Sequence, residues 1–173
     1  MSISRREWIL ATACWAEILR AQPKQFAWFD EATASEIEAI ACEILPDDDT
    51  PGAKRAGVIW FIDGSLAGYD SDKRGLYKDG LADLQSRRAA MFPNSPNIAG
   101  LEHEQRVALL KTIEKTEFFM QVRQHTVLGF LGHPKYGGNR DMVGWNLIGF
   151  EHQMKYEPPF GYYDAEAMRE GSK

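Results

Sequence analysis

The sequence has no long apolar run and no excess of positive charge, and each absence excludes a class of protein. A helix that crosses a bilayer needs at least about 18 consecutive apolar residues, and no such run occurs, so no membrane-spanning helix is expected. The formal net charge is -5 and the sequence pI is about 5.4. Because non-specific nucleic-acid binding requires clustered lysine and arginine, nucleic acid is not an expected partner.

Cysteine is also scarce. Only Cys14 and Cys42 are present, and they form no C-x-x-C or C-x-x-C-H arrangement. Thioredoxin-like redox sites, structural zinc sites and c-type haem attachment sites therefore lack their ligands. The two cysteines can form one disulfide at most, and the simpler interpretation of Cys42 is a small buried apolar side chain on a helix.

Signatures of catalysis, nucleotide binding and metal binding are missing too. The glycine-rich segment near the C-terminus matches neither G-x-x-x-x-G-K-[ST] nor a G-x-G-x-x-G that follows a strand. The four histidines form no i, i+4 pair and no H-E-x-x-H motif. Asp63, Asp70 and Asp141 have no partner at a spacing suited to acid–base work, so they are interpreted as solvated charges. We therefore predict no catalytic, cofactor-binding or metal-binding residue in this chain.

Apolar residues, by contrast, recur at helical spacing along most of the chain. Ser35 is predicted to cap a helix whose apolar stripe runs from Ile37 to Ile44 and stops before Pro46. The acidic run 47–49 lacks the glycine and the distal glutamate of an EF-hand loop, so it predicts a solvated helix-capping loop rather than a calcium site.

The same apolar spacing predicts four further helices, over 53–67, 76–92, 101–116 and 117–131. No stretch alternates with period two for long, as a half-buried strand would. The predicted fold is all-α, an irregular bundle of five or six helices in a single domain over 23–157, followed by an extended tail over 158–173.

The N-terminal segment 1–22 has two interpretations. Arg5 and Arg6 precede the apolar stretch from Trp8 to Ala16, which is the layout of a twin-arginine export signal. Charged residues interrupt that stretch soon afterwards and no cleavage site follows, so the alternative is a first amphipathic helix over 4–20.

Residues 132–150 change character and are predicted to form a long loop. Four glycines and three aromatic residues fall within 135–150, and an aromatic tail follows from Pro158. Aromatic residues and arginine dominate protein interfaces. The predicted partner contacts are therefore Tyr136, Asn139, Arg140, Trp145, Phe150, Phe160 and Tyr162. In the alternative, the loop folds back over the bundle, and Trp145 and Phe150 belong to the core.

The run from His133 to Phe150 resembles the signature of the gluconate 2-dehydrogenase subunit 3 family. In that signature a proline-x-tyrosine-glycine-glycine-asparagine stretch leads into glycine-tryptophan and isoleucine-glycine-phenylalanine, as it does here. A second block from Ile44 to Asp63 resembles the family's earlier helix-loop-helix, so the resemblance covers most of 35–150.

The resemblance implies a non-catalytic small subunit that stabilises a bacterial, membrane-associated flavin dehydrogenase of the glucose-methanol-choline type. The large subunit would hold FAD and oxidise a sugar or sugar acid, and electrons would pass to a cytochrome c subunit. A small subunit of this kind holds no cofactor and, with its twin-arginine signal, can take the folded flavoprotein to the periplasm. Two alternatives are a cytoplasmic assembly factor for such an enzyme and a stand-alone enzyme, which would need an enclosed polar pocket.

Overall fold

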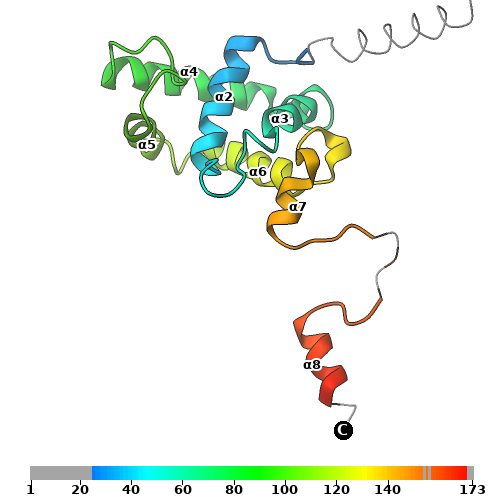
Figure 1. The fold of residues 1–173 in the computed structure, drawn as a ribbon. Helices are drawn as coiled ribbons and strands as arrows, with labels where there is room; N and C mark the ends of the chain where they lie inside the picture. Colours follow the sequence, from blue (N-terminus) through cyan, green and yellow to red (C-terminus); the bar gives the residue numbers. More distant parts are fainter. Residues whose placement is uncertain (1–24, 154, 156, 171–173) are drawn as a thin grey trace, which may run out of the picture.

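Helices α2 (Glu31–Ile44), α3 (Val58–Ala67) and α6 (Glu117–Leu131) form the centre of the computed structural model, which describes residues 25–153, 155 and 157–170 (Figure 1). Arg5, Arg6, Cys14 and the alternative helix over 4–20 lie outside these residues. The described residues contain no strand, which confirms the predicted all-α fold. The other elements are α4 (Arg74–Met91), α5 (His103–Lys111), α7 (Val143–Leu147) and α8 (Tyr162–Glu170), with 3-10 helices η1 (Ser71–Lys73), η2 (Pro134–Tyr136) and η3 (Arg140–Met142).

All five helices predicted between residues 35 and 131 are present, as α2 to α6. α6 begins and ends where the sequence predicted. Thr116 caps its first turn by accepting a hydrogen bond from the Phe119 amide at 3.3 Å. The predicted cap of α2 was wrong. Asp30 takes that role in place of Ser35, since its Oδ1 accepts a hydrogen bond from the Thr33 amide at 2.6 Å, and the helix starts correspondingly earlier.

The acidic run before α3 organises the turn that precedes this helix, as predicted. The carboxylate of Asp47 accepts hydrogen bonds from the amides of Gly52, Lys54 and Arg55 at 2.8–3.2 Å. Residues 53–57 are therefore turns rather than the first part of α3, and the helix is shorter than predicted.

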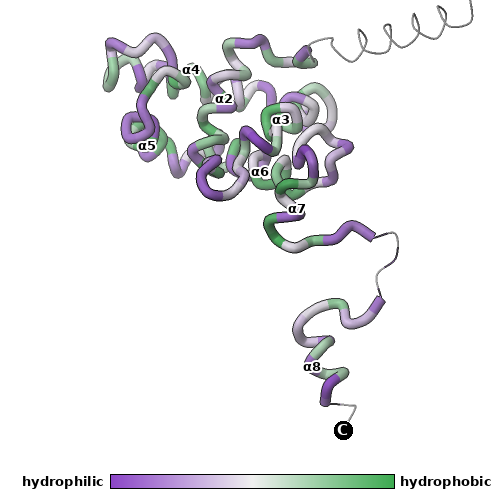
Figure 2. Tube along the Cα trace, viewed as in Figure 1, coloured by the Kyte–Doolittle hydropathy of each residue, from purple (hydrophilic) through white to green (hydrophobic). Residues whose placement is uncertain are grey.

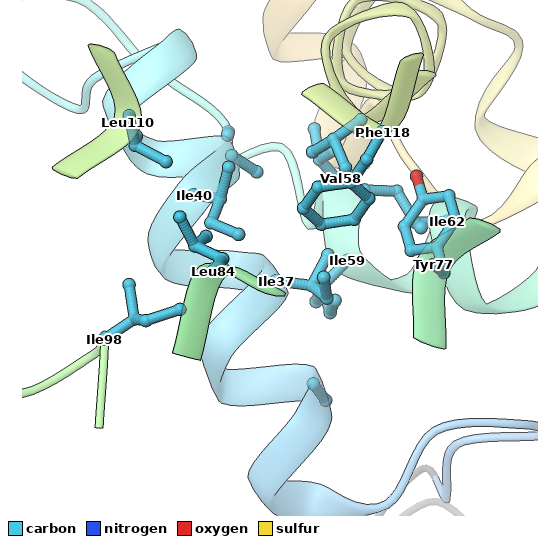
Figure 3. Close-up of a cluster of buried hydrophobic side chains, with 14 of the residues drawn as sticks. Ile37, Ile40, Val58, Ile59, Ile62, Tyr77, Leu84, Ile98, Leu110 and Phe118 are labelled. Atoms are coloured by element: carbon cyan, nitrogen blue, oxygen red, sulfur yellow. The ribbon is translucent and has the colours of Figure 1, made fainter. Parts of the chain in front are cut away.

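The core lies where α2, α3, α4 and α6 meet. Figure 3 shows apolar side chains from α2 and α3 pointing toward those of α4 and α6. α4 and α6 approach so closely that a Cβ atom at Gly80 would lie 2.2 Å from Cγ of Phe118, so only glycine fits there. The fully buried apolar side chains of this core include Ile37, Ile40, Val58, Ile62, Leu66, Leu84, Ile98, Leu109 and Val122.

Asp63 was predicted to be a solvated charge, and this was wrong. It is 3% exposed on α3, and its two carboxylate oxygens accept hydrogen bonds from the amides of Ala27, Trp28 and Phe29 at 2.7–2.9 Å. A buried carboxylate needs such donors to replace water. The side chain therefore fixes the chain segment that leads into α2 against α3.

Asp70 was also predicted to be solvated, but it contacts a buried polar group. His125 of α6 is 1% exposed, and its Nδ1 lies 2.9 Å from the Tyr77 hydroxyl. Its Nε2 lies 2.9 Å from the amide nitrogen of Gln121 and 3.3 Å from the Asp70 carboxylate. Burial lowers the pKa of His125, and the nearby Asp70 carboxylate opposes this effect. These side chains tie α4 and the turn after α3 to α6.

The C-terminal tail was predicted to be extended, but residues 162–170 form α8. The Asp164 carboxylate accepts a hydrogen bond from the Phe160 amide at 2.8 Å, and the Tyr162 hydroxyl donates to Glu166 at 3.1 Å. Figure 1 shows α8 standing away from the bundle at the end of the segment that follows α7. α8 buries none of its residues, so packing against the bundle does not support this helix.

Candidate partner interface

The glycine- and aromatic-rich segment 132–150 folds back against the C-terminal end of α6 rather than forming an open loop. Asn139 fixes its path: the side-chain amide donates to the Gly132 carbonyl oxygen, and the side-chain oxygen accepts from the Gly144 amide, both at 2.9 Å. Asn139 is fully buried, so its predicted contact with a partner was wrong. The residue has a φ of 45°, in the left-handed region that asparagine tolerates better than most side chains.

Two glycines allow this segment to touch α6 directly. A Cβ atom at Gly138 would lie 2.1 Å from the carbonyl oxygen of Gly129, and one at Gly144 would lie 2.0 Å from that of Phe130. Any larger residue would push the segment off the helix. Backbone contact with α6 therefore explains why Gly138 and Gly144 are glycines.

Trp145 of α7 anchors the end of the segment. Its ring is 7% exposed, and its indole Nε1 donates to the Leu131 carbonyl oxygen at 2.6 Å. The rings of His133, Phe150 and His152 surround it, with centroids 5.1–5.5 Å away. We call these four residues the aromatic cluster. Trp145 thus belongs to the folded interior, which is the alternative left open by the sequence.

Arg140 and Tyr136 occupy the outer side of the same segment. The Arg140 amide donates to the Ala56 carbonyl oxygen at 3.0 Å, and its guanidinium carbon lies 5.3 Å from the centroid of the Trp60 ring. Tyr136 is 59% exposed, with the Lys135 ammonium nitrogen 4.8 Å from its ring centroid. Both side chains lie at the surface, as contact with a partner requires.

α6 and α7 also expose a set of apolar side chains that the sequence analysis did not select. Met120, Val127 and Leu131 recur at i, i+7 and i+11, so they lie on one side of α6, opposite the side that faces the core. Figure 2 shows that hydrophobic residues continue at the end of α7 and just beyond it. We call this set the α6–α7 face, with these members and their exposed fractions: Met120 62%, Val127 38%, Leu128 47%, Leu131 37%, Leu147 47% and Ile148 59%.

The sequence predicted the helix over 117–131 but not which of its apolar residues face the core. The structure exposes Val127 and buries Phe118 and Val122. Both sides of α6 are apolar, so spacing alone could not show which side met the bundle. Phe150, at 39% exposed, lies just beyond Ile148, and Phe160 and Tyr162 of the tail are 68% and 71% exposed.

The cavities offer little support for chemistry. A groove of about 410 Å³ between α2 and α4 is lined mainly by apolar side chains, among them Trp28, Ile37 and Leu81. Tyr77 also lines it, but the hydroxyl of this residue is hydrogen-bonded to His125. Burial raises the pKa of the Cys42 thiol to about 11, which makes it a poor nucleophile.

In the described part of the chain, no three metal-ligating side chains gather into one group. None of its helices combines the length and the apolar character needed to span a bilayer. The exposed apolar side chains of α6, α7 and the tail are suited to contact with another protein.

The comparison with known families identifies the same family as the sequence motif from His133 to Phe150. The family model that matches is gluconate 2-dehydrogenase subunit 3, over residues 31–151. The chain belongs to the gluconate 2-dehydrogenase subunit 3 family. For this subunit 3 protein, the matched residues include α2 to α7 and end where the tail leaves the aromatic cluster. No match was found among curated proteins or among solved structures.

Proposed function

We propose that this chain is the non-catalytic small subunit of a flavin-dependent sugar or sugar-acid dehydrogenase of the glucose-methanol-choline type. The family match over residues 31–151 carries the proposal, because it covers most of the folded part of the chain. In this proposal FAD and the catalytic residues belong to the large subunit, and a cytochrome c subunit accepts the electrons. The small subunit stabilises the large one by binding it.

The α6–α7 face is the surface proposed to bind the large subunit. Its six apolar side chains are between 37% and 62% exposed, and monomeric proteins rarely leave contiguous apolar patches of several hundred Å² open to water. Tyr136, Arg140 and Phe150 are exposed at the same end of the bundle, where the segment 132–150 covers the end of α6. Tyrosine and arginine are the side chains most often found at the energetic centre of interfaces.

We further propose that the subunit takes its partner to the periplasm through the twin-arginine signal at Arg5 and Arg6. Replacing both arginines with lysine should leave the complex and the flavoprotein in the cytoplasmic fraction. Unchanged fractionation would instead support the alternative of a cytoplasmic assembly factor that binds the same enzyme.

Purification of the tagged full-length chain from its native host tests the main proposal. A larger yellow protein with flavin absorbance should co-purify with it, and the complex should oxidise a sugar or sugar acid with a dye as electron acceptor. A colourless monomer that shows no flavoprotein at any protein concentration or salt would contradict the proposal. A turnover activity of that isolated monomer would favour a stand-alone enzyme.

A further inference from the structure

The C-terminal arm, residues 153–170 as far as they are described, carries large side chains that the bundle does not cover. Phe160, Tyr162 and Tyr163 are 68%, 71% and 84% exposed, and Met168 is 47% exposed. In Figure 1 the arm extends from the end of α7 and ends in α8, away from the helices of the bundle. Aromatic side chains bury a large area when they bind, so this density of them on an uncovered segment points to a binding role.

α8 is short for a helix with no packing partner. It has nine residues, and isolated helices shorter than about 12–15 residues are marginal in water. Local hydrogen bonds support its first turn, between the Phe160 amide and Asp164 and between the Tyr162 hydroxyl and Glu166. These contacts favour the helical form and leave the rings of Phe160 and Tyr163 available to a partner surface.

The arm starts from a fixed point. The His152 ring stacks on Trp145 with centroids 5.3 Å apart and meets the His133 ring edge-on at 5.2 Å. Trp145 is in turn hydrogen-bonded to Leu131, a member of the α6–α7 face. The nine residues 153–161 can span about 30 Å at most, so α8 must bind within that distance of the aromatic cluster.

The charge of the arm indicates the chemistry of the surface that it fits. Four carboxylates, on Glu157, Asp164, Glu166 and Glu170, outnumber the two cations on Lys155 and Arg169. Lys155 is already paired with Glu157 at 2.8 Å, which leaves the excess of negative charge on α8. A complementary surface is therefore apolar where it receives the aromatic rings and basic at its rim.

We propose that the C-terminal arm is a second attachment point for the flavoprotein large subunit, in which Phe160 and α8 dock in an apolar groove with a basic rim. The inference rests on the proposed function, and it adds a separate site to the α6–α7 face. The arm lies beyond residues 31–151, so the family match does not cover it. The proposed attachment concerns this chain and is not a statement about the family. Two sites joined by a short tether strengthen binding beyond either site alone.

The test compares tagged full-length variants purified with the large subunit. The arm variant is Phe160→Ser with Tyr163→Ser, and the matched control is Tyr69→Ser, a tyrosine 96% exposed on the turn after α3. The amount of flavin recovered per small subunit is measured over a dilution series. The arm variant should need roughly tenfold more protein for the same recovery, because truncated aromatic anchors are costly, and the control should match the wild type.

A charge variant tests the basic rim. Glu166→Lys with Glu170→Lys should weaken recovery at low salt, and the loss should shrink at about 0.5 M salt because exposed charges are then screened. Recovery that is equal to wild type in the arm variant would overturn the inference, whatever the charge variant shows.

The melting temperature of each free subunit separates docking on the partner from docking on the bundle. No change is expected in the arm variant, because α8 buries nothing in the bundle. A fall of several degrees would show that the arm packs on its own chain and would overturn the inference. If the wild type recovers no flavoprotein at all, the proposed function is wrong. If the wild type recovers it normally and the arm variant does so equally well, only the proposed attachment through the arm is wrong.

Discussion

The indole Nε1 of Trp145 donates a hydrogen bond to the carbonyl oxygen of Leu131, with 2.6 Å between the two atoms. The last carbonyl groups of a helix have no partner within the helix itself, so this bond satisfies one at the end of α6. The same ring stacks on His152, where the C-terminal arm begins. One side chain thus determines how α7 and the root of the arm sit on α6.

Trp145→Phe is expected to lower the free energy of unfolding by about 0.5–1.5 kcal/mol, because the part-buried Leu131 carbonyl loses its donor while an aromatic ring remains. Trp145→Ala should cost about 3–5 kcal/mol, since most of the buried ring is lost as well. Urea denaturation measures both. Tyr136→Ala is the control, expected within about 0.5 kcal/mol of wild type because that ring is 59% exposed. Unchanged stability of Trp145→Phe would show that the hydrogen bond contributes nothing.

Asp63→Asn should destabilise the fold by about 2–4 kcal/mol, because the buried carboxylate accepts charge-assisted hydrogen bonds from three backbone amides that lead into α2. An asparagine has one acceptor oxygen, and its NH₂ group would face a backbone donor. The matched control is Asp83→Asn, whose carboxylate is 52% exposed and pairs with Arg87 at the surface. Exposed ion pairs of this kind contribute about 0–1 kcal/mol. Equal losses in the two variants by chemical denaturation would contradict the role given to Asp63.

The contrast between Asp63 and α6 shows what the sequence could predict. α6 follows from local information, a capping threonine and apolar residues at helical spacing, and its ends were predicted correctly. The role of Asp63 depends on amides more than 30 positions away, which no local pattern reports. α7 was missed because its five residues begin with valine and glycine, both poor helix formers, and contact with α6 stabilises it instead.

Which side chains of the segment 132–150 and the tail are exposed was predicted only in part, for a similar reason. Composition pointed to the segment 132–150 and the tail, and Tyr136, Phe160 and Tyr162 are exposed there. It could not distinguish them from Asn139 and Trp145, which lie in the same segment but are buried by contacts with α6. Exposure depends on tertiary packing, so it becomes visible only in the structure.

Stability should fall as the pH falls below the ordinary pKa of histidine. Burial lowers the pKa of His125 from 6.5, although Asp70 opposes the shift. As the pH falls through 6.5 the unfolded chain binds a proton before the folded one does, so the free energy of unfolding decreases until the folded-state pKa is reached. At higher pH, where His125 is neutral in both states, it adds no pH dependence to the free energy of unfolding.

His125→Gln removes this titration and should flatten the melting temperature between about pH 7 and pH 5.5 relative to wild type. The slope of the melting temperature against pH is compared between the two proteins, because losing the hydrogen bond to Tyr77 also shifts the melting temperature itself. His103→Gln is the control, since that side chain is 70% exposed beside Glu43. Parallel curves for wild type and His125→Gln would rule out the predicted contribution.

The α6–α7 face should matter for assembly and not for folding. Met120 and Leu128 are 62% and 47% exposed. Each substitution of the double variant Met120→Ser with Leu128→Ser should therefore change the free energy of unfolding by less than about 0.5 kcal/mol. In the complex both side chains would be buried, and their loss should weaken recovery of the flavoprotein roughly tenfold. Met91→Ser is the matched control, a methionine 41% exposed at the end of α4, which Figure 1 places far from α7. If Met91→Ser weakens recovery equally, the loss does not depend on where the apolar side chain lies, and the large subunit does not bind at α6.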